Sequence, residues 1–168
     1  MIHLEPAKEQ DFAMIMNIIE DAKQLRKAQG STQWQDGYPN EQTIRNDYLH
    51  HNAYVLTDGK NLLAYCAIIF NDEPAYEQID GKWLNEDPFF VIHRVAITKK
   101  ELGKGYGNLI FKLIEDFCKE REIYNIKVDT HFDNQAMLSI LEKLGYVYCG
   151  EVYFRGSPRR AFQKVLTT

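Results

Sequence analysis

A glycine-rich segment carries the clearest chemical signal in this sequence. Its residues are Leu102-Gly103-Lys104-Gly105-Tyr106-Gly107-Asn108. They follow an apolar run and precede an amphipathic one, which predicts a buried strand, a short loop and the start of a helix. The first turn of a helix has N–H groups without internal partners, and its dipole places partial positive charge there. Because glycines let a phosphate come close, we expect main-chain amides here to bind a diphosphate.

The spacing of these glycines excludes two common nucleotide-binding motifs. The segment lacks the final glycine of G-x-G-x-x-G and does not fit G-x-x-x-x-G-K-[ST]. Another diphosphate ligand is therefore required. A flexible loop followed by a helix cap is the alternative, and the glycines alone leave both interpretations open.

Hydrophobic periodicity predicts the elements that position this segment. We expect helices over residues 9–30, 40–50, 106–121 and 134–145, and strands over 2–5, 53–57, 61–70, 89–97, 124–129, 146–154 and 160–165. The strand at 61–70 is apolar on both faces, so it should be central. The order is β-α-α-β-β-β-α-β-α-β-β, an α/β (α+β) fold with a central mixed sheet flanked by helices.

Composition favours one globular domain over residues 1–168, with 45% apolar and 26% charged residues. The net charge of -4 argues against a nucleic-acid partner that relies on broad phosphate neutralisation. The start of the chain lacks signal-peptide features and no apolar run could span a bilayer, so we expect a cytoplasmic protein without a membrane partner. Cys66, Cys118 and Cys149 fit neither a disulfide framework nor a paired zinc site, which predicts buried thiols and no metal.

The motifs in this order resemble the GNAT superfamily of N-acetyltransferases. The resemblance rests on strand, loop, Leu102 to Gly107, helix and strand, and on the stretch from Asn134 through Leu144-Gly145-Tyr146. It covers the second half of the chain and implies a single N-acetyltransferase domain with acetyl-CoA as co-substrate. Gly105 and Gly107 fill the glycine positions of the family's acetyl-CoA motif, and Leu102 stands where Arg or Gln is usual. Main-chain amides could still bind the diphosphate of acetyl-CoA, because any residue except Pro provides one.

The resemblance also implies further contacts to the co-substrate. The strand through Val95 and Ile97 should splay from the following strand and offer its backbone to the pantetheine arm. Asn134 should contact acetyl-CoA, although the residue alone indicates a helix cap. Many family members carry a Tyr seven residues later to protonate the leaving thiolate, and this sequence has Leu141. Another hydroxyl, unaided departure of the thiolate, or absence of catalysis all stay open.

His93 is the first candidate for the catalytic base. An alkyl amine with a pKa of about 10.4 must lose a proton before it attacks, and an imidazole titrates in the useful range. Strand alternation places His93 on the same side as Val95. The alternative is a structural His with hydrogen bonds inside the sheet. Arg94 should point the other way and pair with an acid.

The acceptor is predicted to be an amine, with a small molecule as the preferred class. Trp34, Tyr38 and Tyr65 are candidates for the walls of its pocket, with core packing as the alternative for Trp34 and Tyr65. Acids at strand ends, Glu73, Glu86 and Asp87, could attract a cationic amine. Polyamine, amino acid, antibiotic and protein N-terminus all stay open as acceptors. A non-catalytic acetyl-CoA-binding regulatory module and a structural homodimer are the competing interpretations.

Overall fold

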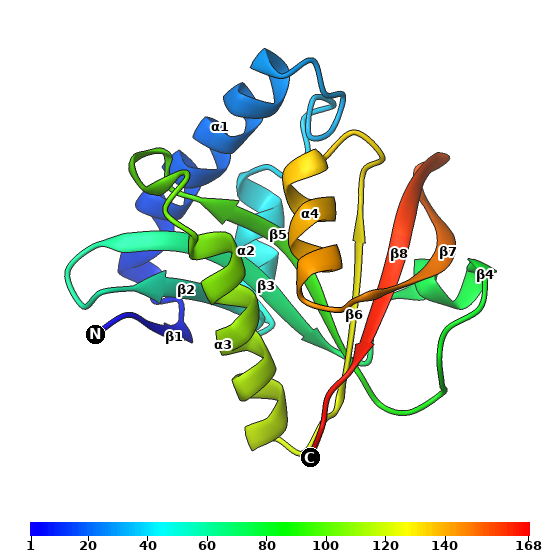
Figure 1. Cartoon of the computed structure of the whole chain (residues 1–168). Coiled ribbons are helices and arrows are strands. Elements are labelled where there is room, and N and C mark those ends of the chain that lie inside the picture. Colours follow the sequence, from blue (N-terminus) through cyan, green and yellow to red (C-terminus); the bar gives the residue numbers. More distant parts are fainter. The chain divides into compact units, whose positions relative to one another are not determined.

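The computed structural model describes residues 1–168, and its contacts divide the chain into two compact units. Unit 1 comprises Met1–Ile68 and Arg94–Leu113, and unit 2 comprises Ile69–His93 and Ile114–Thr168. The chain passes from one unit to the other within β3 (Leu62–Phe70), β5 (Phe90–Ile97) and α3 (Tyr106–Glu120). Figure 1 shows these elements along the chain.

Unit 1 contains an antiparallel set of strands covered by two helices. β1 (His3–Pro6) pairs with β2 (Ala53–Thr57), and β2 pairs with β3. The end of β5 lies beside β3, because the Thr98 amide donates to the Leu63 carbonyl at 2.9 Å. α1 (Phe12–Ala28) and α2 (Glu41–Leu49) bury their apolar faces on these strands. One core cluster of the unit consists of Ile15, Ile18, Ile19, Ala22, Ile44, Ala53, Val55, Tyr65 and Ala96.

Unit 2 contains the mixed part of the sheet. The start of β5 runs parallel to β6 (Asn125–Thr130), which pairs antiparallel with β8 (Ser157–Val165). β8 pairs with β7 (Val147–Phe154), and β7 pairs with the two-residue β4 (Asp80–Gly81). The hydrogen-bonded order is β1-β2-β3-β5-β6-β8-β7-β4. α4 (Gln135–Lys143) follows β6 in the chain.

The predicted order of elements is confirmed, with differences in detail. The structure adds β4 and three short 3₁₀ turns to the predicted set. β8 starts at Ser157 rather than at residue 160, because the hairpin turns at Arg155 and Gly156, whose φ angles of 50° and 77° suit a two-residue loop. Asn40 and Asn134 cap α2 and α4 by accepting hydrogen bonds from Thr43 and Met137 amides.

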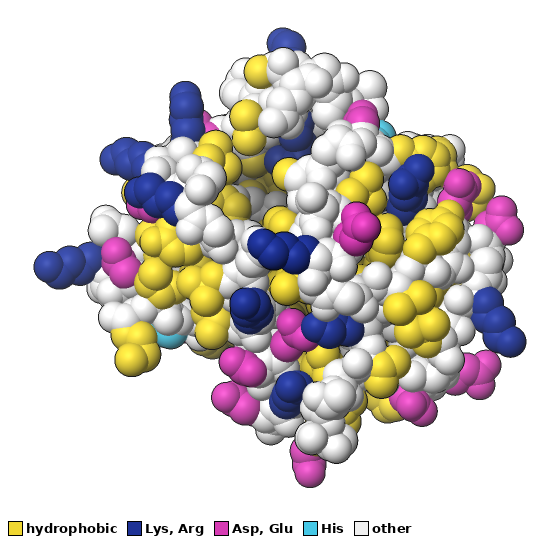
Figure 2. All heavy atoms as spheres, viewed as in Figure 1, with side chains coloured by type: hydrophobic (Ala, Val, Ile, Leu, Met, Phe, Trp, Pro, Cys, Tyr) yellow, Lys and Arg dark blue, Asp and Glu magenta, His cyan; other side chains and the backbone are white.

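Charged side chains of both signs lie on the surface, and the cysteines lie inside the protein. Figure 2 shows Lys and Arg side chains interspersed with Asp and Glu on the visible face. All three cysteines are free and buried, as predicted. No helix is both long enough and apolar enough to cross a membrane.

Candidate active site

The glycine-rich loop of unit 1 needs its glycines for backbone conformation. Lys99–Glu101 forms a 3₁₀ turn after β5, and Gly103 and Gly105 then adopt φ angles of +80° and +84°. A Cβ atom at either glycine would meet nothing within 4 Å, so side-chain crowding is not the constraint. The constraint is the left-handed backbone, which L side chains adopt at a cost.

α3 begins directly after this loop. Leu109 is the residue whose amide donates to Gly105 O, at 3.1 Å, so the amides of residues 106–108 form the first turn and have no partner within the helix. The Asn108 Oδ1 atom is buried and has no hydrogen-bond partner in the protein. Buried polar atoms normally have partners. Main-chain donors and an unsatisfied acceptor therefore meet at one helix start, which fits a phosphate-bearing ligand with N–H or O–H groups.

The side chains of Leu102 and Lys104 offer less to a diphosphate than the backbone of this loop does. Leu102 is 42% exposed, so its side chain fills no buried position. Lys104 lies 2.9 Å from Glu101, and this hydrogen bond raises the pKa of the Lys104 ammonium. The charge of Lys104 is thus already balanced by a neighbouring acid. The loop would bind a diphosphate mainly through its backbone.

The other positions that the resemblance implies as contacts to acetyl-CoA are divided between the two units. Val95 and Ile97 lie in β5, in the same unit as the loop. The parallel ladder between β5 and β6 ends at the pair Ile92 and Val128, before Val95 is reached. Asn134 lies in unit 2, where it caps α4 and stays a predicted contact. Leu141 is fully buried, and a leucine side chain provides no hydroxyl group at that position.

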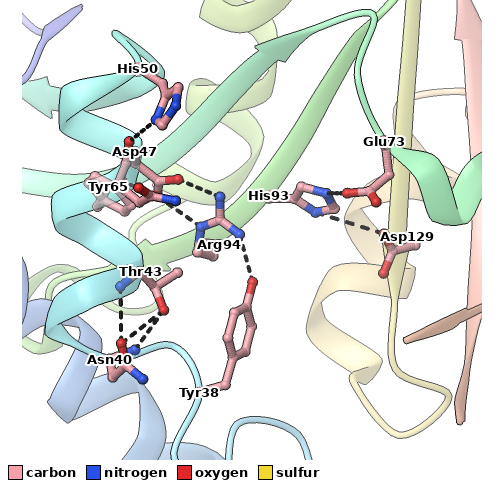
Figure 3. A network of polar contacts seen from close by, with 11 residues as sticks. Tyr38, Asn40, Thr43, Asp47, His50, Tyr65, Glu73, His93, Arg94 and Asp129 are labelled. Carbon is pink, nitrogen blue, oxygen red and sulfur yellow. Dashed lines mark hydrogen bonds and ion pairs between the residues drawn. The ribbon is translucent and has the colours of Figure 1, made fainter. Parts of the chain in front are cut away.

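His93 lies between two carboxylates in unit 2 (Figure 3). Its Nε2 atom is 2.7 Å from Glu73 Oε2, and its Nδ1 atom is 3.8 Å from Asp129 Oδ2. The three side chains are 12%, 15% and 8% exposed. Glu73 is held in place because it also caps the 3₁₀ turn Pro74–Gln78 through the Ala75 amide. A largely buried imidazole held by acidic partners has contacts typical of a general base.

Asp129 is fixed by a second set of contacts. The Tyr76 hydroxyl donates to Asp129 Oδ2 at 2.6 Å, and the Trp83 indole N–H donates to the Tyr76 carbonyl at 2.9 Å. Burial raises the pKa of the Asp129 carboxyl, while His93 opposes the shift. These aromatic residues thereby fix the acid that faces Nδ1 of His93.

Arg94 belongs to a separate network in unit 1 (Figure 3). Its Nε and Nη2 atoms donate to Asp47 at 2.8 and 2.6 Å, and its Nη1 atom donates to the Tyr38 hydroxyl at 2.6 Å. Burial opposes the charge of the guanidinium, but Tyr38 and Asp47 outweigh burial and raise the pKa of Arg94. The expected pairing of Arg94 with an acid is confirmed.

Arg94 also interrupts the regular strand. Its φ of +57° lies in the left-handed region, which is uncommon for a residue other than glycine. Strict alternation does not apply across such a residue. Strand alternation therefore does not place His93 on the side of Val95, although His93 stays a candidate through its own contacts.

The three aromatic residues predicted to line the acceptor pocket have different surroundings in unit 1. Tyr65 is fully buried in the core and donates to Asp47 at 2.6 Å. Trp34 packs against the same core, with the Arg26 guanidinium 3.8 Å above its ring. Tyr38 reaches Arg94 through its hydroxyl. Beside this network lies an open hollow of about 360 Å³ lined by Asn40, Gln42, Thr43, Asn46, Asp47 and Arg94.

Comparison with known proteins now assigns the family. A sequence profile of the acetyltransferase (GNAT) family matches residues 14–146, which is most of the chain. The chain belongs to the GNAT family. A GNAT acetyltransferase from Streptococcus agalactiae 2603 has a similar structure, with a TM-score of 0.90, 34% identity, and coverage of 99% of this chain and 96% of that one. The protein is accordingly an acyltransferase.

Two more distant structures share the GNAT fold. A GNAT acetyltransferase from Listeria monocytogenes 4b F2365 has a TM-score of 0.78 at 19% identity, covering 98% of this chain and 95% of that one. The NatC complex bound to Gag peptide and CoA has a chain with a TM-score of 0.69 at 16% identity, with 99% of each chain covered. At these identities the likeness shows the fold alone.

Sequence reasoning missed several polar residues of this GNAT chain. Asp47, Tyr76 and Asp129 were not among the candidates. Asp47 follows the buried Ile44 by three positions on α2, so its place on the apolar face of the helix was a usable signal. Asp129 lies on β6, where the polar residues Asn125 and Lys127 are also only 3% and 5% exposed. Alternation alone does not tell a solvated face from one covered by other residues.

Proposed function

We propose that the protein transfers the acetyl group of acetyl-CoA directly to the nitrogen of a small-molecule amine. The observation that carries the proposal is the start of α3, where first-turn amides follow a loop with Gly103 and Gly105 in left-handed conformations. The GNAT family supports acetyl-CoA as the donor. One solved structure with this fold is described as bound to CoA, which further supports that choice.

Several residues would hold the co-substrate in this proposal. The amides of Tyr106, Gly107 and Asn108 would bind the diphosphate, and the main chain of Val95 and Ile97 would bind the pantetheine arm. Acetyl-CoA itself supplies an acetyl group activated as a thioester. The loop would bind the diphosphate mainly through its backbone, because the charged side chain of Lys104 is paired with Glu101.

His93 is proposed to accept the proton of the amine. If Nε2–H donates to Glu73 at 2.7 Å, the Nδ1 atom carries the lone pair that takes the proton. The imidazolium that forms would be stabilised by Glu73 and by Asp129, whose Oδ2 lies 3.8 Å from Nδ1. In this proposal the two ring nitrogens therefore have different tasks.

The cysteines support direct transfer over an acetyl-enzyme on a thiol. Cys66 and Cys118 are fully buried. Burial raises the pKa of Cys66, and it raises the pKa of Cys118 to about 12. A thiol must ionise to act as a nucleophile, so neither is suited to that role near neutral pH.

Two measurements test the proposal. Acetyl-CoA is titrated into the protein by calorimetry, and CoA release is then followed with a thiol reagent across a panel of amines. Binding with turnover is the expected result. Binding without turnover would instead support a regulatory module, and absence of both would support a structural protein.

A further inference from the structure

The hollow beside α2 has a neutral, hydrogen-bonding lining. Four of its six lining residues, Asn40, Gln42, Thr43 and Asn46, are uncharged polar residues. Its volume of about 360 Å³ falls within the range of small-molecule pockets, roughly 300–1,000 Å³. The hollow lies entirely in unit 1, as does the glycine-rich loop. We call it the α2 hollow.

The charged pair in the α2 hollow is balanced internally. Asp47 and Arg94 are 6% and 11% exposed and form a bidentate ion pair. A polyamine would need uncompensated acids, and here the one carboxylate is already neutralised by Arg94. A cationic chain would also meet the guanidinium. The lining therefore disfavours polyamines.

Arg94 keeps hydrogen-bonding capacity after these contacts. A guanidinium has five N–H donors, and three are used by Asp47 and Tyr38. The remaining two belong to the terminal nitrogens, Nη1 and Nη2. Nitrogens of this kind pair with oxygen atoms of a carbonyl or carboxylate.

α2 adds two side-chain amides to the same hollow. Gln42 and Asn46 are exposed, four residues apart on the helix, and therefore on one face. Asn40 and Thr43 instead bond to each other in the helix cap, at 3.0 and 3.2 Å. The amides of Gln42 and Asn46 are thus the adaptable donors and acceptors of the lining.

We propose that the α2 hollow recognises the carbonyl or carboxylate oxygen of an α-amino acid or its amide, which makes such compounds the acceptor class. The inference rests on the proposed acetyl transfer to an amine. Arg94 directly precedes Val95, the first residue proposed to bind the pantetheine arm. This adjacency favours an oxygen close to the reacting nitrogen over one at the far end of a long chain.

The first test compares matched acceptors. Leucine, leucinamide, isoamylamine (leucine without its carboxyl group) and spermidine are assayed with wild type and with Asn46→Ala. The variant should lower kcat/KM for leucine or leucinamide about tenfold and leave isoamylamine within about twofold. Comparing variant with wild type for each amine cancels differences in intrinsic nucleophilicity. Leucine and leucinamide differ in charge, so their ratio identifies which oxygen is preferred.

A control and an activity-independent measurement complete the test. Gln24→Ala, at an exposed position on α1, should leave kcat/KM for each of the four amines as it is in wild type. In ¹⁵N spectra with CoA present, leucinamide or leucine should shift the side-chain amides of Gln42 and Asn46. Equal losses for all amines, or unshifted amides at the highest soluble concentration of both ligands, would overturn the inference. Turnover of isoamylamine or spermidine alone would overturn it while leaving acetyl transfer intact, whereas missing turnover with shifted amides would contradict only the transfer.

Discussion

Arg94 and Asp47, which are 47 positions apart in the sequence, form a bidentate ion pair with N···O distances of 2.6 and 2.8 Å. Both side chains are nearly buried. Tyr65 and Tyr38 complete the pair by hydrogen bonds to Asp47 and Arg94. The pair therefore joins α2 to the strand that leads into the glycine-rich loop.

Asp47→Asn should destabilise the fold strongly. The substitution keeps the shape of the side chain but leaves the buried guanidinium without a counter-charge, which typically costs about 3–5 kcal/mol. Urea unfolding measures the loss. The pair of Arg45 with Glu9 is the control, because Glu9 is 64% exposed, and Glu9→Gln should cost less than about 1 kcal/mol. Equal losses would show that the buried pair has no special role.

Gly105→Ala should weaken acetyl-CoA binding. The added methyl group meets nothing within 4 Å, so the effect comes from a backbone φ of +84°. The alanine favours other conformations by about 1–2 kcal/mol, and the loop would then present its amides differently. Calorimetry with acetyl-CoA measures the change.

Gly59→Ala is the matched control for that substitution. Gly59 has a φ of +95° and open space around it, but it lies in the turn between β2 and β3. The Gly59→Ala variant should lose about as much stability as Gly105→Ala and keep its affinity for acetyl-CoA. If both variants bind acetyl-CoA like wild type, the loop is not the diphosphate site.

The cysteine thiols should be protected in the folded protein. Cys66 and Cys118 are fully buried, and burial raises the pKa of Cys149 as well. A thiol reagent at neutral pH should therefore modify them slowly in the native state and fully in urea. Mass spectrometry of the modified chain counts the reacted thiols. Rapid labelling of Cys66 in the native protein would contradict the packing of β3.

The features that were predicted correctly from the sequence depend on residues close together in the chain. The caps at Asn40 and Asn134 and the turn at Gly59 depend on residues only a few positions apart. The order of strands and helices follows from periodicity within each segment. These features need no knowledge of which segments meet.

Long-range contacts explain what the sequence did not predict. Glu73 and His93 are 20 positions apart, and their contact depends on a 3₁₀ turn in a stretch that carries no periodic pattern. Arg94 has a positive φ of 57° although it is not a glycine, and its partners Asp47 and Tyr38 lie 47 and 56 positions away in the sequence. The polar side of β6 was ambiguous for the same reason, since other segments bury it.

Asp129 should make stability fall with rising pH. Burial raises the pKa of its carboxyl above the ordinary 3.8, so the folded state holds the proton more tightly than the unfolded state. The free energy of unfolding then decreases between pH 3.8 and the raised pKa. Asp129→Asn removes this contribution, so the stability of wild type relative to the variant should decline across that window in urea titrations.

Asp58→Asn is a control of opposite sign. Amide hydrogen bonds from Asn61 and Lys60 lower the pKa of the exposed Asp58 carboxyl. Its contribution to stability is present above the ordinary pKa and is lost as the pH falls. The free energy of unfolding of wild type should therefore increase relative to that of Asp58→Asn as the pH rises. The same trend for both variants would contradict the burial of Asp129.

His93→Ala should strongly lower the rate of acetyl transfer. Loss of a general base typically lowers the rate by about 10²–10⁴, and Glu73→Gln should have a smaller effect because Asp129 still faces the ring. Profiles of kcat/KM against pH for both variants measure these changes. His3→Ala is the control, because His3 is 46% exposed and pairs with Glu5 on β1. If His93→Ala lowers thermal stability but keeps the rate and the profile, His93 is a structural residue and another group takes the proton.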